Sequence, residues 1–316
     1  MMPKKIPFHK WNDILGFQTA QESVEILFYP VEVPDSEKEL FLHHKPLSRY
    51  RQAYEDVLSN FITMGEFTYE LYLATPYFVE IYEKWKQKQD FQWQFLFVSL
   101  IGACLATDFP YNHFSKKLNE SLPKEIIENH LYSVKIMQEQ TKAFISDHFE
   151  KLKQLNHTEA QYFCQCLFAI LGDREASYIF FLRNFNGCSI VCPYCIDSDE
   201  ICYEFDWNKI NEESTCKLPF HYSDAAGHWY MRGDKSICKP PKEICLAPSA
   251  IGQWDWKSYD NDYVWFSNLL YFLGNEESAK KLSYYYGVFT CPNCGKTSIV
   301  MDLAKYTMIQ NTESDL

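Results

Sequence analysis

The stretch "VFTCPNCGKTSIV", residues 288–300, decides how the C-terminal half of this chain is organised. It holds two cysteines three residues apart with a proline between them, and a glycine and a β-branched run follow. The stretch "IVCPYCIDSDEICYEF", residues 190–205, repeats this arrangement earlier in the chain. Two thiolates at this spacing on a tight turn supply half of a closed, tetrahedral zinc site. We call each Cys-Pro-x-Cys turn a knuckle, and the chain has two.

Together the two knuckles have the four thiolates that a structural zinc site needs. The sequence therefore predicts one shared Zn²⁺, bound by Cys192, Cys195, Cys291 and Cys294. Two separate sites are an alternative, the first completed by Cys188, Cys202 or Cys216, and knuckles without metal are another. A redox dithiol is disfavoured, because thioredoxin-type motifs open a helix whereas β-type sequence follows the second cysteine here.

The sequence before each knuckle is also repeated. The segments "YFCQCLFAILGDREASYIFFLRNFNGCSIVCPYC", 162–195, and "VWFSNLLYFLGNEESAKKLSYYYGVFTCPNC", 264–294, each have a helix ending at Leu-Gly, a second aromatic helix, a glycine and a knuckle. We interpret this as a duplicated helix–turn–helix–knuckle unit. Asp173 and Asn275 are the expected N-caps of the second helices. The segments "ICYEFD" and "SIVMDL", 201–206 and 298–303, are expected to be strands that complete a zinc ribbon.

The part of the chain before the first knuckle predicts helices in succession, from Ser48 to about Phe185. "LSRYRQAYEDVLSNFITMG", 47–65, places apolar residues at three- and four-residue steps, and "FQWQFLFVSLIGACLATD", 91–108, is nearly all apolar, as expected of an inner helix. Pro76 is expected near the start of a second helical stretch. Thr158 and Gln161 are an expected capping box.

These patterns predict a mainly α fold, in which stacked antiparallel helix pairs carry a small zinc-ribbon-like β element in the C-terminal half. The expected domains are an irregular or helical segment over 1–47, a helical scaffold over 48–187, and a zinc-knuckle module over 188–316. This last module includes an inserted loop region between the knuckles and the second helix–turn–helix copy.

Charge and composition narrow the function classes. The chain has 316 residues, 30 of them basic and 42 acidic, for a formal net charge of −12. This field repels nucleic acid and attracts basic partners, although many acidic proteins are acidic for solubility alone. No signal peptide is indicated, and the longest apolar run, 95–106, falls short of the ~18 residues that cross a bilayer. We therefore expect a cytoplasmic protein without membrane contact, whose 12 cysteines are thiols or metal ligands rather than disulfides.

No catalytic constellation is indicated. The sequence has no HExxH, GxSxG, Walker or dinucleotide-binding motif. A metal-dependent hydrolase would use His221, His228 and a carboxylate such as Asp224, but the interpretation of these histidines as loop or core residues is favoured. We therefore expect a protein that is not an enzyme.

Acidic and aromatic residues gather between the two knuckles. Residues 196–213 hold seven acids and one lysine, and 254–266 interleave Trp, Tyr and Asp. Aromatics supply contact area at interfaces and carboxylates steer and pair with Lys or Arg, so this composition suits a face for a basic protein. The expected partner-binding residues are Asp197, Asp199, Glu200, Glu204, Asp206, Trp254, Trp256, Asp260 and Asp262. A solvated face with its aromatics turned inward is the alternative.

The stretch "YEDVLSNFITMGEFTYELYLATPYFVEIYEKW", 54–85, together with the apolar helix that follows, resembles the opening helix pairs of bacterial HEAT-like proteins. The matching positions are Gly65, Tyr72, Ala74, Thr75, Pro76, Phe78 and Val79. The resemblance covers residues 48–185, and some such proteins also have Cys-Pro-x-Cys knuckles after the helical repeat. Several occur beside polymorphic toxins as their immunity proteins. The resemblance thus implies a protein that binds and blocks one cognate toxin, and the acidic charge suits a basic nuclease.

Two other functions stay open. A zinc-ribbon protein could bind nucleic acid, with aromatics stacked on bases, but that needs a Lys/Arg cluster, and the basic stretches "MMPKKIPFHK" and "GDKSICKPPK" are short. A zinc hydrolase using His221 and His228 is the third hypothesis.

Overall fold

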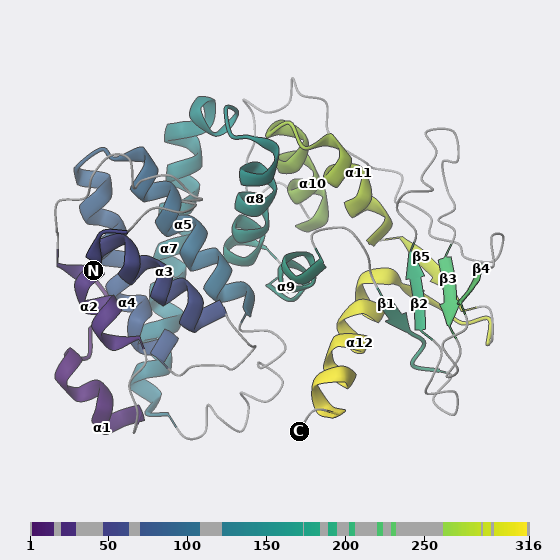
Figure 1. Ribbon diagram of the computed structural model, residues 1–316, viewed down its shortest axis with the longest axis horizontal. Coiled ribbons are helices and arrows are strands. Elements are labelled where there is room, and N and C mark those ends of the chain that lie inside the picture. The colour runs from purple at the N-terminus through teal and green to yellow at the C-terminus, as the bar shows by residue number, and fades with distance from the viewer. Residues whose placement is uncertain are drawn as a thin grey trace. The chain divides into compact units, whose positions relative to one another are not determined.

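The structure is a computed structural model. It describes residues 2–15, 20–29, 47–62, 70–107, 122–172, 174–183, 189–194, 202–205, 220–223, 229–231, 262–285, 287–291 and 294–314. Within these ranges the chain is mainly helical, with short antiparallel strands in the C-terminal half, as predicted (Figure 1). The HEAT-like repetition of the helix pairs stays a prediction.

Two compact units make up the chain. Unit 1 comprises Met1–Leu152 and Gln165–Arg174, and unit 2 comprises Lys153–Cys164 and Glu175–Leu316. The domain boundaries predicted at 47/48 and 187/188 stay predictions.

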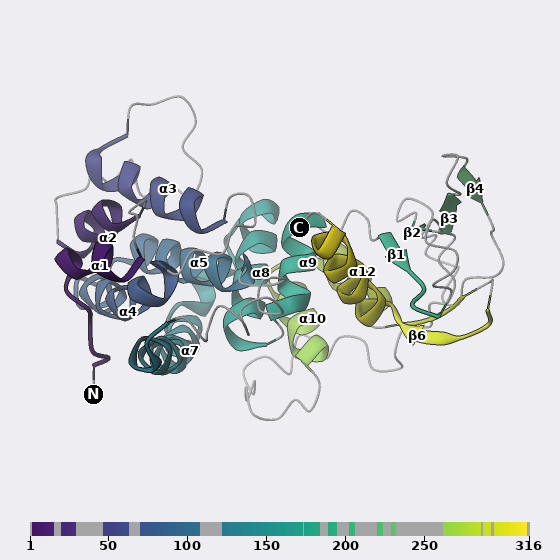
Figure 2. The ribbon, with the colours of Figure 1, turned by 90° about the horizontal axis from the view of Figure 1, so that it is seen from below.

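Unit 1 is a set of packed helices around α4. Its elements are η1 (Phe8–Lys10), α1 (Trp11–Leu15), α2 (Gln21–Phe28), α3 (Arg49–Ile62), α4 (Glu70–Gln87), α5 (Phe91–Thr107), α7 (Lys124–Leu152) and the second half of α8 (His157–Leu171). Helix α4 packs against α1, α2, α5 and α7. In Figure 2, α4 and α5 lie between α3 on one side and α7 on the other. This central position explains why most of the α4 side chains are buried.

Aromatic side chains fill the interior of unit 1. The rings of Trp85 and Trp93 stack with their centroids 5.3 Å apart. The Trp85 indole N–H donates to the Tyr50 hydroxyl at 3.0 Å, and the Tyr54 hydroxyl donates to the Leu96 carbonyl at 3.1 Å. Burial raises the pKa of both tyrosine hydroxyls above the ordinary value. The polar ends of Trp85, Tyr50 and Tyr54 are therefore satisfied inside an apolar core, whereas the Trp93 indole N–H has no hydrogen-bond partner among the described residues.

Pro76 lies inside α4 and not at the start of a second helical stretch, so that prediction was wrong. Proline has no N–H to donate to the carbonyl four residues back, which here belongs to Tyr72. The Thr75 hydroxyl lies 2.7 Å from the Leu71 carbonyl and 3.4 Å from the Tyr72 carbonyl. The neighbouring hydroxyl thus gives a polar contact to the carbonyl that the proline leaves without an N–H.

A buried histidine joins α7 to α4. The Nδ1 atom of His130 lies 2.7 Å from the Thr75 hydroxyl, and the imidazole packs on the Tyr72 ring at 4.2 Å. Because the Thr75 hydroxyl donates its proton to the Leu71 carbonyl, the His130 Nδ1–H is the donor to Thr75. Burial, with a smaller effect of the Arg174 charge, lowers the pKa of His130 to about 3. The imidazole is therefore neutral at neutral pH.

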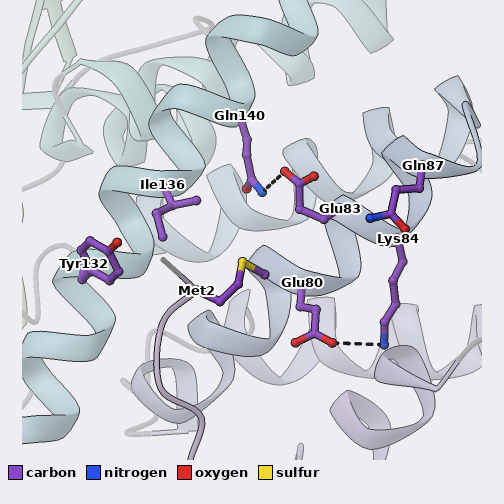
Figure 3. Close-up of a pocket in the computed structure, with 8 residues that line it drawn as sticks. All are labelled: Met2, Glu80, Glu83, Lys84, Gln87, Tyr132, Ile136 and Gln140. Atoms are coloured by element: carbon purple, nitrogen blue, oxygen red, sulfur yellow. Dashed lines mark hydrogen bonds and ion pairs between the residues drawn. The ribbon is translucent and has the colours of Figure 1, made fainter.

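A groove of about 660 Å³ lies between α4 and α7 on the surface of unit 1 (Figure 3). Its walls are formed by Met2, Glu80, Glu83, Lys84, Gln87, Tyr132, Ile136 and Gln140. We call it the α4–α7 groove.

Unit 2 alternates helices with short strands. Its elements are the first half of α8, then α9 (Arg174–Arg183), β1 (Ser189–Val191), β2 (Cys202–Phe205), β3 (Phe220–Ser223), β4 (Trp229–Met231), α10 (Asp262–Phe272), α11 (Glu276–Tyr285), β5 (Val288–Thr290), β6 (Thr297–Ile299) and α12 (Val300–Ser314). Strands β1 to β4 form an antiparallel sheet in sequential order, and β5 and β6 form a hairpin. The order helix, helix, strand occurs twice, before Cys192 and before Cys291, as the duplication requires, and the duplication itself stays a prediction.

The helix caps in the structure agree only in part with those predicted from the sequence. The Asn275 side chain accepts a hydrogen bond from the Ser278 N–H at 3.3 Å, as expected of an N-cap, whereas Asp173 lies outside the described residues. At the start of α8 the reciprocal bonds join Asn156 and Glu159, at 2.9 and 3.2 Å. The capping box predicted at Thr158 and Gln161 therefore lies two residues too late.

Candidate metal centre

The second knuckle is the turn of the β5–β6 hairpin. The Cys291 N–H donates to the Lys296 carbonyl at 2.9 Å, and the Gly295 N–H donates back to the Cys291 carbonyl at 2.9 Å. Gly295 has a φ of +70°, a left-handed conformation that side chains rarely adopt. The glycine after the second cysteine therefore lets the backbone fold back under the two thiols.

After the second knuckle the chain turns into a helix sooner than predicted. The expected strand 298–303 ends at Ile299, and α12 begins at Val300. The Val300 N–H donates to the Gly287 carbonyl at 3.0 Å, and the apolar side chains of Met301 and Leu303 are buried. Burial of these side chains along α12, which packs against β1, β6 and α11, explains why the β-type pattern does not continue as a strand.

The first knuckle follows β1, and its strand is held by α12. The Val191 N–H donates to the Thr307 hydroxyl at 2.8 Å, and this hydroxyl donates to the Leu303 carbonyl at 2.7 Å. The predicted strand after this knuckle is confirmed as β2, whose Cys202 lies opposite Val191 in the antiparallel register. Helix α12 thus begins directly after β6, the strand that follows the second knuckle, and its Thr307 binds β1, the strand that precedes the first knuckle.

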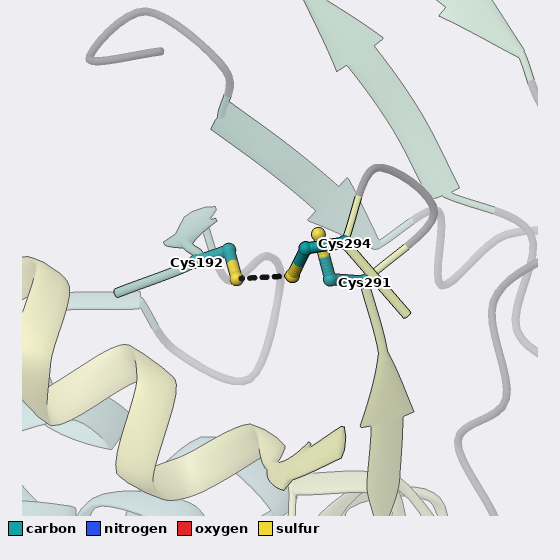
Figure 4. A group of neighbouring side chains, drawn as sticks. All are labelled: Cys192, Cys291 and Cys294. Atoms are coloured by element: carbon teal, nitrogen blue, oxygen red, sulfur yellow. Dashed lines mark hydrogen bonds between the residues drawn. The ribbon is translucent and has the colours of Figure 1, made fainter. Parts of the chain in front are cut away.

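Three of the four predicted ligands come together. The Sγ atoms of Cys192, Cys291 and Cys294 all lie within 4.8 Å of one another, and those of Cys192 and Cys294 are 3.7 Å apart (Figure 4). Tetrahedral geometry with Zn–S bonds of ~2.3 Å places two ligand sulfurs about 3.8 Å apart. This cluster could therefore hold a metal ion. We call it the three-thiol cluster.

The cluster is only partly exposed. Cys192 and Cys291 are buried, and Cys294 is exposed. Burial raises the pKa of the Cys192 thiol above the ordinary value, and hydrogen bonds with Cys291 and Cys294 raise it further. Without a cation, the thiol form is thus favoured here, whereas a metal ion would stabilise the thiolates.

Of the remaining predicted ligand positions, Cys195 lies outside the described residues, as do Cys188 and Cys216. Among the described residues, the three-thiol cluster is the one group of His, Cys, Asp and Glu side chains arranged to hold a metal ion. Two independent sites stay the alternative prediction.

Most of the predicted partner-binding face lies outside the described residues: Asp197, Asp199, Glu200, Asp206, Trp254, Trp256 and Asp260. Two positions are placed by the backbone. Glu204 lies in β2, opposite Ser189 and His221 in the two ladders, and Asp262 is the first residue of α10. The face therefore stays a prediction.

The described residues do not bring together the side chains that the hydrolase hypothesis needs. His221 lies in β3, so its assignment to a loop was wrong. His228 and Asp224 lie outside the described residues. Sequence reasoning also missed Thr307, because a threonine in an amphipathic helix has no local feature that shows its bond to a strand 116 residues earlier.

Comparison with known proteins gives no family. No protein-family model matches the chain, and searches of curated proteins and of solved structures found no match. Within the described segments, none of the helices combines the length and the apolar character that a bilayer crossing requires.

Proposed function

We propose that the three-thiol cluster is a structural zinc site that joins the two knuckles. The observation that carries this proposal is the convergence of Cys192 with Cys291 and Cys294, because Cys192 and Cys294 are separated by 102 residues in the sequence. Cys195 supplies the fourth thiolate, since a Cys-Pro-x-Cys turn places its second cysteine beside the first. Four thiolates leave Zn²⁺ no open position for a substrate, so the site is structural and not catalytic.

The first experiment measures zinc by inductively coupled plasma mass spectrometry in the wild type and in Cys192→Ser, Cys195→Ser and Cys291→Ser variants. We expect one zinc per chain in the wild type and loss of zinc in each variant. Cys104→Ala is the matched control, because this thiol is buried in α5 of unit 1 and is not one of the three clustered thiols. Two zincs per chain, with each knuckle variant losing one, would replace the shared site by two sites.

The chain as a whole is, in this proposal, a cytoplasmic, non-enzymatic scaffold that binds a basic protein, in its sharpest form a toxin that it neutralises as an immunity protein. Three points support it: the net charge of −12, the acidic and aromatic composition between the knuckles, and the resemblance to bacterial HEAT-like proteins. A protein of this charge attracts basic partners at long range and gains specificity from close charge pairs.

The test of the scaffold is co-expression with a basic toxin encoded beside the gene. We expect a complex that survives purification, and suppression of the toxin's activity in the test tube. Reversal of Asp197, Asp199 and Glu200 to lysine should slow association, whereas the same reversal at three exposed acids of unit 1, Glu22, Glu125 and Glu128, should have a smaller effect. Absence of a complex at micromolar concentration contradicts the proposal.

Nucleic-acid binding is the second candidate, favoured by one observation. Tyr194, inside the first knuckle, is 59% exposed and its ring could stack on a base. Fluorescence polarisation with single-stranded DNA at several salt concentrations tests this candidate. An affinity that falls steeply with salt and is lost in Tyr194→Ala supports nucleic-acid binding, and the absence of binding rules it out.

A further inference from the structure

The α4–α7 groove lies within unit 1, and the metal centre makes no use of it. Three of its features point to a ligand: a buried amide and a carboxylate that, among the described residues, lack a partner for the amide oxygen and a cation for the carboxylate, and an exposed apolar wall.

Gln140 is the buried amide. Its side chain projects from α7 toward α4 (Figure 3) and the residue is 8% exposed. The amide nitrogen donates to the Glu83 carboxylate at 2.7 Å and to the Val79 carbonyl at 3.2 Å. Because both partners can only accept, the orientation of the amide is fixed. Its Oε1 atom consequently has no hydrogen-bond partner among the described residues, which is unfavourable for a buried acceptor.

Glu83 is the carboxylate that no cation of the described residues neutralises. Its neighbour on α4, Glu80, forms ion pairs with Lys5 and with Lys84, the latter at 3.6 Å. Glu83 has the Gln140 amide as its polar partner, and no cation of the described residues pairs with it. The groove thus has one neutralised carboxylate and one that still offers its charge.

The wall beside these acceptors is apolar and exposed. Met2 is 50% exposed and Tyr132 is 41% exposed, and Ile136 lies between Tyr132 and Gln140 along α7. A lysine or arginine covers such a surface with its aliphatic stem while its head reaches polar groups. The apolar wall and the acceptors of the groove therefore match one long cationic side chain.

The N-terminal segment of the chain shows this chemistry on the same face. Lys5 pairs with Glu80 while its ammonium lies 4.6 Å from the centre of the Phe28 ring, and Lys4 pairs with Glu125 of α7. Two lysines from an extended segment are thus already bound along α4 and α7.

We propose that the α4–α7 groove binds a lysine or arginine side chain of a protein partner. The cationic head pairs with the Glu83 carboxylate beside the Gln140 amide, and the stem lies on Met2, Tyr132 and Ile136. The inference rests on the proposed function, a scaffold for a basic protein, and adds one contact of that complex. It also predicts the partner's contribution, a protruding basic side chain.

The test uses Nα-acetyl-lysine amide as the probe, with Nα-acetyl-norleucine amide as its uncharged isostere. Two-dimensional ¹⁵N NMR of the full chain records the Gln140 side-chain amide and the α7 backbone during titration. We expect saturable shifts with the lysine probe and none with the norleucine probe. Glu83→Gln keeps an acceptor for the Gln140 amide but removes the charge, and it should weaken binding about tenfold, the effect of losing one charged hydrogen bond.

Glu139→Gln is the matched control, because Glu139 precedes Gln140 on α7, is exposed, pairs with Lys142 and does not line the groove. It should bind the lysine probe as the wild type does. Equal shifts with both probes, or an unchanged affinity in Glu83→Gln, overturn the proposal. The lysine probe could also bind while Glu83→Gln leaves the affinity for the partner protein unchanged. The groove would then be a site for a free amine, and this result too overturns the proposal.

Failure of the groove and failure of the scaffold are distinguishable. If the lysine probe binds in the groove while no partner protein binds the chain at micromolar concentration, the proposed function fails. If a basic partner binds with equal affinity to the wild type and to Glu83→Gln, the scaffold stands and the groove proposal fails.

Discussion

In unit 1, Trp85 and Trp93 stack at 5.3 Å inside a core of long helices, whereas in unit 2 the strands beside the knuckles are only three or four residues long. Helix α4 alone has 18 residues and buries most of them. A hairpin as short as β5–β6 is marginal in water without further support. In unit 2, α12 packs against β1 and β6, and the three-thiol cluster could hold a metal ion that ties the hairpin to the first knuckle.

The difference shows two ways of stabilising one chain. Apolar burial in unit 1 is spread over many side chains, so that each contributes about 1.5–3 kcal/mol. A metal site concentrates stabilisation on a few atoms and depends on the ligands being deprotonated. The two units should therefore respond to different perturbations, with the largest effect expected from removal of the metal.

Removal of zinc should destabilise unit 2 and leave unit 1 folded. Structural zinc contributes on the order of 10 kcal/mol to the folding of small zinc domains. In hydrogen exchange, a chelator or Cys291→Ser should abolish protection of 288–290 and 297–299 while the amides of α4 and α5 keep theirs. Equal loss of protection in both units would show that the comparison is wrong.

Gly102→Ala should destabilise unit 1 by about 3 kcal/mol, the upper range for overpacking. A Cβ at Gly102 would lie 2.4 Å from the Cβ and the carbonyl oxygen of Cys166 and 2.5 Å from its Cα. Since two of these atoms are backbone, Cys166→Gly should not rescue the variant. Hydrogen exchange of α5 measures the effect, and a stable Gly102→Ala protein would contradict the close approach of α5 and α8.

Acid should weaken unit 1 through His130. Its pKa of about 3 in the folded chain lies below the ordinary value of 6.5, so the unfolded chain binds more protons between these values. The contribution of His130 to the free energy of unfolding is fully present above pH 6.5. It falls as the pH decreases, by up to about 1.4 kcal/mol per pH unit. Urea unfolding at several pH values, with hydrogen exchange of α7 as the readout, should show this dependence of the unfolding free energy on pH. His130→Gln should flatten it, and an unchanged slope would assign the effect to other groups.

Gly295→Ala should cost about 1 kcal/mol of the stability of the second knuckle. The position has a φ of +70° and open space where a Cβ would lie, so the penalty is conformational and not steric. Gly295→Asn is the matched control, because asparagine tolerates the left-handed region better. Competition for zinc against a chelator measures both, and an alanine variant with wild-type affinity would contradict the role given to the turn.

The sequence predicted the features that depend on local chemistry. The spacing within each knuckle follows from the geometry of two thiolates on one turn, and the apolar run of α5 follows from complete burial. The duplicated order of elements was visible for the same reason, since each copy repeats its own turn residues, such as Gly274 and Asn275.

Features that depend on distant contacts could not be predicted. The end of β6 at Ile299 depends on the burial of α12 against β1, and the role of Thr307 depends on the same packing. The position of Gln140 in the α4–α7 groove likewise follows from the approach of two helices separated in sequence. Polar residues of this kind look like ordinary helix surface until their neighbours are known.

The separation of Cys192 from Cys294 has a consequence for the nascent chain. The β5–β6 hairpin closes over a few residues, whereas bringing Cys192 to it closes a loop of 102 residues, at an entropy cost of about 4 kcal/mol. At a synthesis rate of about 5–20 residues per second, Cys192 waits about 5–20 seconds on the ribosome before its partner thiols exist. During that interval the first knuckle supplies only part of the ligand set, because the thiols of the second knuckle have not been synthesised. If the cluster holds zinc as proposed, zinc binding therefore comes late, after the second knuckle has been synthesised.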